Sequence, residues 1–150
     1  GGGAGPRRSS IMADAKKLAR VLRVRTLQLG LAQAQEVRLR ETHAHEAALS
    51  SRIARLAADV APTADSAAGV SLAAAAYYRE RLHRSAETTA NRVRTAEVEA
   101  ERAAEATRAA KRDQSAVEKL IARAETAAVL REIGKLRDAP PTRKVRHDPC

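Results

Sequence analysis

The side chains that most often perform chemistry are few in this sequence. His43 and His45 stand two residues apart, which turns them about 200° from each other on a helix, so they cannot readily share one metal ion. His147 and Cys150 lack further ligands at the spacing of a zinc site. The sequence also has no glycine-rich phosphate loop and no plausible pair of nucleophile and base. We therefore expect no metal, no cofactor, no small-molecule substrate and no enzymatic activity.

The residues best suited to binding are the two tyrosines, which are adjacent and are the only aromatic residues in the chain. On a helix Tyr78 lies four residues before Leu82, next to an apolar stripe, whereas Tyr77 is turned about 100° toward solvent. An exposed tyrosine beside Arg79 and Arg81 has the composition of a binding hot spot. We expect Tyr78 to close the hairpin near its turn and Tyr77 to contact a partner. The alternative is that both tyrosines only cover a turn.

Composition indicates that these residues stand on long helices. Hydrophobic residues make up 44% of the chain and aromatic residues 1%, so alanine with some leucine, isoleucine and valine must form a thin core. Charged residues at 31% are typical of long helices or coiled coils. The only cysteine is the last residue, and no apolar run approaches the roughly 20 residues of a membrane span. These features predict a cytoplasmic protein without a thick-cored catalytic domain.

Two proline-free segments show helical periodicity, at about 14–61 and about 66–137, and Pro62 separates them. The second segment has a seam spaced alternately by three and four residues, which is typical of coiled coils. That seam consists of Ala75, Leu82, Ala86, Val93, Ala96, Ala100, Ala103, Ala110, Val117, Ile121, Ala124 and Ala128. Two long helices joined by a short turn run antiparallel. The predicted fold is therefore all-α, a long antiparallel two-helix coiled-coil hairpin.

The hairpin is expected to span residues 13–138, between two disordered termini. Residues 1–12 are glycine-rich at their start and are expected to be disordered, with Met12 as the native first residue. Residues 139–150 contain Pro140 and are expected to form a flexible basic tail.

The unequal helix lengths predict an apolar overhang at the end that carries the termini. If the turn is centred near residue 66, the first helix ends opposite about residue 119, and residues 120–136 project beyond it. The apolar residues of this projection include Leu120, Ile121, Leu130 and Ile133. An unpartnered apolar surface usually marks an interaction site, so we expect a partner protein there. The alternatives are that the tail folds back or that the protein associates with itself.

A basic face lies near the start of the first helix. Lys16, Arg20 and Arg23 fall opposite Leu18 and Leu22. The formal net charge of the whole chain is +10. Such a face could meet an acidic protein, an anionic lipid or nucleic acid, or it could simply be solvated. Nucleic acid is the less favoured partner, because the chain has no aromatic stacking platform and glutamates largely match the arginines of the second helix.

Several segments resemble the FliJ family, small coiled-coil components of the bacterial flagellar type III export apparatus. They are "KKLARVLRVRTLQLGLAQAQ", the proline-marked turn, "YYRERLHRSAETTANRV" and "VEKLIARAE". The similarity covers about residues 12–137. It implies a non-enzymatic stalk that links the export ATPase ring to the membrane export gate protein, with a further role toward export chaperones. It also implies a cytoplasmic location, peripherally associated with the inner membrane.

The resemblance also implies which end of the hairpin meets which partner. The end with the termini would address the ATPase, through Lys16, Arg20, Arg23, Leu120, Ile121, Leu130 and Ile133. The other end would face the gate, through Tyr77, Tyr78 and Leu82. The alanine-rich tip departs from the family pattern, because it leaves few large side chains for the gate contact. The alternative function is that of a basic coiled-coil protein that binds nucleic acid or an anionic membrane surface.

Overall fold

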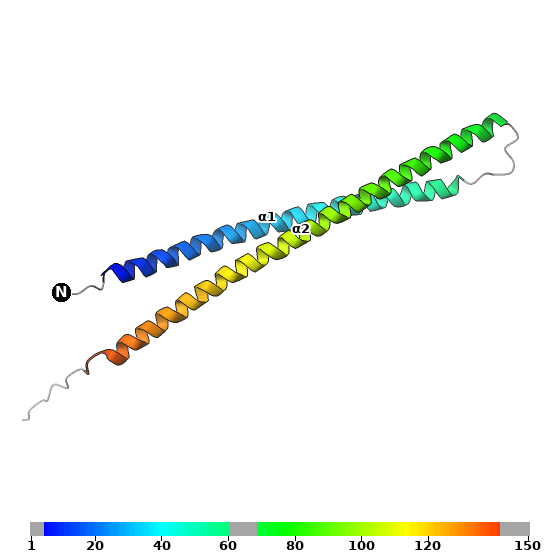
Figure 1. Cartoon of the computed structure of the whole chain (residues 1–150). Coiled ribbons are helices and arrows are strands. Elements are labelled where there is room, and N and C mark those ends of the chain that lie inside the picture. The colour runs from blue at the N-terminus through cyan, green and yellow to red at the C-terminus, as the bar shows by residue number, and fades with distance from the viewer. Residues whose placement is uncertain (1–4, 61–68, 142–150) are drawn as a thin grey trace, which may run out of the picture. The chain divides into compact units, whose positions relative to one another are not determined.

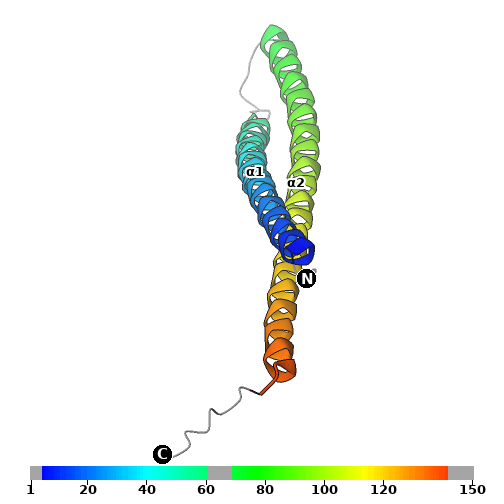
Figure 2. The same ribbon diagram turned by 90° about the vertical axis from the view of Figure 1, so that its left-hand side faces the viewer.

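The computed structural model describes residues 5–60 and 69–141, which form two long helices (Figure 1). Helix α1 spans Gly5–Asp59 and helix α2 spans Gly69–Asp138. Both helices are continuous coils in the turned view of Figure 2 as well. The described residues contain no strand, which confirms the predicted all-α fold.

The composition of α2 explains its length. Alanine, glutamate, arginine and leucine have high helix propensity, and no proline interrupts the helix. The threonines, which are weaker helix formers, satisfy their hydroxyls within the helix. Thr88 donates to the carbonyl of Arg84 at 3.0 Å, and Thr126 donates to that of Ala122 at 2.9 Å.

The chain divides into two compact units, each of which holds a stretch of both helices. We call residues 1–25 with 113–150 the terminal unit and residues 26–112 the hairpin unit. Within the terminal unit, α1 and α2 run antiparallel, since Arg25 lies near Asp113 while Ile11 lies near Ala128. Within the hairpin unit they also run antiparallel, since Glu46 pairs with Arg92 and Ile53 lies near Ser85.

The core is as thin as the composition predicts. Among the described residues, the buried hydrophobic side chains are Leu29, Ala96, Ala103, Ala104 and Val117. Most other members of the predicted α2 seam are half-buried, so the seam is confirmed as the face that meets α1. Thr89 is buried in the same seam, and its hydroxyl donates to the carbonyl of Ser85 at 2.9 Å. The alanine-lined seam buries little apolar area, which limits what packing alone contributes to stability.

The register of the helices differs from the one predicted. Arg25 pairs with Asp113 at 3.3 Å, and Arg92 pairs with Glu46 at 2.9 Å. In each pair the two residue numbers add to 138. A turn centred on residue 66 would have made that sum 132. Each residue of α1 therefore lies opposite a residue of α2 that is about six positions, or nearly two helical turns, later than predicted.

The predicted apolar overhang is therefore wrong. Ile11 and Leu18 of α1 border a groove together with Ile121 and Ala128 of α2. The first helix reaches this far because it begins at Gly5 and because the register shifts it toward the end of α2. Within the terminal unit, α1 thus covers the seam face of the segment that was expected to project alone.

The boundaries also correct the predicted termini. A helix from Gly5 contradicts the expected disorder of residues 5–12. Helix α2 begins at Gly69 instead of residue 66 and ends at Asp138, one residue beyond the predicted end. The predicted turn around Pro62 and the basic tail beyond residue 141 lie outside the described residues.

Candidate partner-binding surfaces

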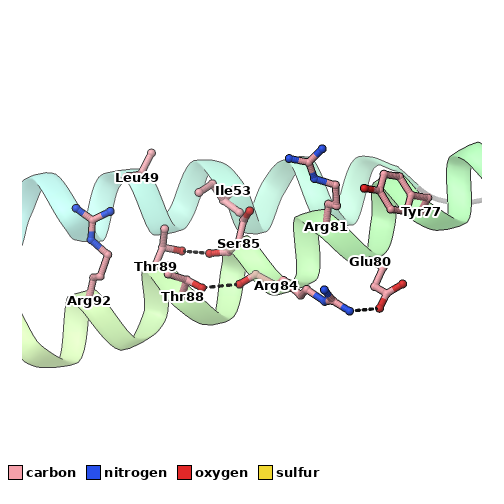
Figure 3. Close-up of a pocket in the computed structure, with 10 residues that line it drawn as sticks. All are labelled: Leu49, Ile53, Tyr77, Glu80, Arg81, Arg84, Ser85, Thr88, Thr89 and Arg92. Carbon is pink, nitrogen blue, oxygen red and sulfur yellow. Dashed lines mark hydrogen bonds and ion pairs between the residues drawn. The ribbon is translucent and has the colours of Figure 1, made fainter.

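The hairpin unit has a groove of about 730 Å³ between its two helices (Figure 3). Leu49 and Ile53 line it from α1. From α2 it is lined mainly by polar side chains, among them Tyr77, Arg81 and Arg92. The groove therefore combines an aliphatic wall with an aromatic ring and several guanidinium groups.

The groove brings together one of the predicted gate residues with side chains that the sequence analysis did not assign to a site. The register of the Glu46–Arg92 pair places Asp59, the last residue of α1, opposite Arg79, so both tyrosines lie at the end of the hairpin unit where α1 ends. Tyr77 and Tyr78 are 63% and 52% exposed. The turn that Tyr78 is predicted to close lies within residues 61–68, outside the described residues, so the role of Tyr78 at the turn stays a prediction. Leu82 is half-buried.

The arginines of the groove differ in their partners. Arg84 pairs with Glu80 at 2.8 Å, so its charge is matched within α2. Arg81 lies over the ring of Tyr77, 5.9 Å from the centroid, which is a cation–π distance. None of the described ion pairs involves Arg81. The Tyr77–Arg81 pair is therefore the part of the groove best suited to a carboxylate next to an apolar group.

Glu46 joins the two helices at the end of this groove. Its Oε1 accepts a hydrogen bond from Arg92 at 2.9 Å, while its Oε2 is buried and has no hydrogen-bond partner. The side chain is only 17% exposed, which makes Arg92 its essential counter-charge. The sequence analysis missed this pair, because a contact between residues 46 positions apart depends on the register.

The terminal unit has an apolar groove of about 460 Å³ between the helices. Ile11 and Leu18 line it from α1, and Ile121, Ala124 and Ala128 line it from α2. The small alanine side chains leave this space open. Ile121, predicted to contact a partner, faces α1 across the groove instead.

The other predicted residues of the terminal unit lie on its surface. Lys16, Arg20 and Arg23 are exposed, while Leu18 and Leu22 on the opposite side of α1 are half-buried, which confirms the basic face. On α2 the side chains of Leu120, Leu130 and Ile133 are exposed. The unit therefore carries both a cationic and an apolar surface, although not at the end of an unpaired helix.

A network of ion pairs lies on the surface of α2 in the hairpin unit. Arg108 donates to Glu101 and to Glu105, both at 2.9 Å, and Arg112 donates to Glu105 at 3.1 Å. The hydrogen bond from Arg112, followed by that from Arg108, lowers the pKa of Glu105. In turn the hydrogen bonds to Glu101 and Glu105 raise the pKa of Arg108. All these groups are solvated, so the network supports the helix without forming a pocket.

The described part of the chain forms neither a metal site nor a membrane span. Residues 10–60 and 72–141 bring together no group of three histidine, cysteine or acidic side chains that could hold a metal ion. Neither α1 nor α2 combines the length and the apolar character that crossing a bilayer requires.

Comparison with known proteins adds no assignment. No protein-family model, no curated protein and no solved structure matches the chain. The functional interpretation therefore depends on the residue patterns and on the two surfaces described above.

Proposed function

We propose that this chain is a non-enzymatic stalk component of the flagellar type III export apparatus, which links the export ATPase ring to the membrane export gate. The observation that supports this most directly is the surface of the terminal unit. There an exposed basic face on α1 accompanies exposed apolar side chains on α2. Such a surface suits a protein partner, because it combines cationic with apolar side chains.

On this proposal the terminal unit binds the ATPase. Lys16, Arg20 and Arg23 would supply long-range attraction to an acidic surface, and Leu130 and Ile133 would supply apolar contacts. Leu120 is exposed and would join them, whereas Ile121 would act through packing against α1.

The hairpin unit would meet the export gate through the exposed Tyr77 and Tyr78, with Leu82 supporting them from a half-buried position. The thin core supports a connector, because the buried hydrophobic residues among the described part of the chain are five side chains of small or medium size. The location that follows is cytoplasmic, at the inner face of the inner membrane, with export chaperones as further partners.

The proposal is tested by measuring binding of the full chain to a flagellar export ATPase. The triple variant Lys16→Glu, Arg20→Glu, Arg23→Glu reverses the basic face without touching the seam. We expect its affinity to fall by about tenfold or more, because each reversal places like charges across the interface. The matched control is Arg52→Glu with Arg55→Glu, two exposed arginines of the same helix within the hairpin unit.

Two results would reject the ATPase assignment. One is a triple variant that binds the ATPase as well as the unaltered chain does. The other is tight binding of DNA or RNA by the unaltered chain that persists as salt is raised to the physiological range, which would favour a nucleic-acid partner. Removing residues beyond 119 is not a suitable test, because it would also remove the packing partners of Ile11 and Leu18.

A further inference from the structure

Helix α2 carries a second heptad stripe in the terminal unit. Its members follow one another at spacings of four, three, four and three residues, and all of them are exposed: Ala122, Thr126, Val129, Ile133 and Leu136. They lie about 130° around the helix from the seam residues Val117, Ile121, Ala124 and Ala128. The three large members are 58%, 45% and 77% exposed, in chain order. A partner on this stripe would not displace α1.

The charges beside the stripe are sorted by sign. In heptad notation Thr126 and Ile133 take position a, and Ala122, Val129 and Leu136 take position d. All three g positions then hold glutamate, namely Glu118, Glu125 and Glu132. The e positions hold Arg123, Leu130 and Arg137. One flank is thus acidic, whereas the other is basic with a leucine at its centre.

We propose that a second copy of this chain covers the stripe, with the two α2 helices parallel. In a parallel pair a g residue of one helix meets the e residue five positions further along the other. Glu118 would face Arg123 of the second copy, and Glu132 would face Arg137 of the second copy, each contact occurring twice by symmetry. An antiparallel pair would instead set glutamates against glutamates and arginines against arginines.

The residue types within the stripe also agree with a parallel pair. Isoleucine at a followed by leucine at d favours parallel two-stranded coiled coils, and Ile133 with Leu136 provides that combination. Lys119 occupies the a position one heptad before Thr126, and a polar side chain at such a position specifies register at a cost in stability. The Nζ atom of Lys135 lies 3.5 Å from the Oε1 atom of Glu132 in the same helix. This exposed ion pair is weak, so the carboxylate of Glu132 can still accept a hydrogen bond from Arg137 of a second copy.

The inference does not depend on the proposed function, because it concerns the free chain. The two proposals share residues, however, because Leu130 and Ile133 would contact both the second copy and the ATPase. Self-association and ATPase binding would therefore compete for this surface.

The test is sedimentation equilibrium of the full chain alone over a range of concentrations. We expect a mass that rises from one chain toward two. Ile133→Lys places a charge in the stripe and should leave the chain monomeric at concentrations where the unaltered chain is dimeric. Leu27→Lys is the control, because Leu27 is also an exposed large apolar residue and lies in the hairpin unit. A chain that stays monomeric throughout, or a dimer that Ile133→Lys leaves intact, would overturn the proposal.

Charge reversal tests the flanks and cysteine cross-linking tests the orientation. Glu118→Arg with Glu132→Arg sets arginines against Arg123 and Arg137 of the second copy and should abolish the dimer. Adding Arg123→Glu and Arg137→Glu to that variant reverses the charges of both pairs and should restore the dimer. In a Cys150→Ser background, Leu136→Cys should form an interchain disulfide under mild oxidation, because equivalent d residues meet in a parallel pair. A dimer that Leu136→Cys cannot cross-link would rule out the parallel arrangement.

Discussion

The guanidinium of Arg25 lies 3.3 Å from the carboxylate of Asp113, although 88 residues separate them in the chain. Arg92 and Glu46 form a second such pair between α1 and α2, at the same register. Successive heptads of the seam are similar because most of them present alanine. Apolar packing alone therefore distinguishes poorly between registers. These two ion pairs therefore supply the specificity that the seam lacks.

The two pairs should contribute differently to stability. Both partners of the Arg25–Asp113 pair are about half exposed, so we expect Arg25→Ala to lower the free energy of unfolding by about 0.2–1 kcal/mol. Arg92→Ala leaves the largely buried carboxylate of Glu46 without a partner and should cost about 1–3 kcal/mol. Denaturant unfolding followed by circular dichroism gives both values. Equal losses for the two variants would contradict the special role of Glu46.

The seam should tolerate no larger side chain at its most buried positions. Ala103 is 7% exposed, and a leucine there would force the helices apart. We expect Ala103→Leu to destabilise the protein by about 1–3 kcal/mol, as overpacked cores do. Ala106→Leu is the control, since Ala106 is exposed on the same helix and leucine is almost as good a helix former as alanine. A stable Ala103→Leu variant would show that the two helices are not in close contact at this point.

Sequence periodicity was sufficient to predict two antiparallel helices and the seam of α2. A run such as Ala96, Ala100 and Ala103 leaves one face apolar whatever lies opposite it. The register was beyond reach, because it depends on which glutamate or aspartate meets which arginine, and the sequence offers several choices. The error in the register is one of the two reasons why the predicted overhang was wrong.

The start of α1 was missed for a different reason. The glycines at the beginning of the chain suggested disorder, yet the helix begins at Gly5 and Pro6 follows directly. Proline is tolerated in the first turn of a helix, where its missing N–H has no partner to lose. Ile11 then lies beside Ala128 in the terminal unit, which gives the extra turns an apolar partner that local sequence could not reveal.

Acid should weaken the charged network of α2. The pKa of Glu105 lies below its ordinary value of 4.5, because Arg112 and Arg108 hydrogen-bond to the carboxylate. The contribution of Glu105 to stability is therefore fully present above that value, and it is lost as the pH falls through the lowered pKa of the folded state. We expect Glu105→Gln to lower the melting temperature at neutral pH but not in strong acid. Glu97→Gln, which removes an exposed carboxylate outside the network, should show a smaller difference, and equal behaviour of the two variants would contradict this role.

Two glycines within the helices offer stabilising substitutions. A Cβ atom built at Gly30 or at Gly134 meets no atom within 4 Å, and both positions are helical. Alanine there removes freedom from the unfolded chain without a steric penalty, so Gly30→Ala and Gly134→Ala should each add about 0.4–1 kcal/mol to the free energy of unfolding. Thermal melts of the two variants check this. A loss of stability at Gly30 would indicate that the helix needs to bend at this point.

Tyr77 is the side chain on which the gate assignment depends most. Its ring is exposed and carries Arg81 over one face, so truncation should remove a binding contact while leaving the helices folded. We expect Tyr77→Ala to weaken binding to the cytoplasmic domain of an export gate protein by about tenfold, the range of an interface hot spot, with unchanged helicity. Tyr77→Phe keeps the ring and its contact with Arg81, and it should retain most of the affinity. Val98→Ala, an exposed truncation elsewhere on α2, controls for general loss of surface area. If Tyr77→Ala binds the gate protein as well as the unaltered chain does, the tyrosine serves only to cover the end of the hairpin unit, and the gate contact must lie elsewhere.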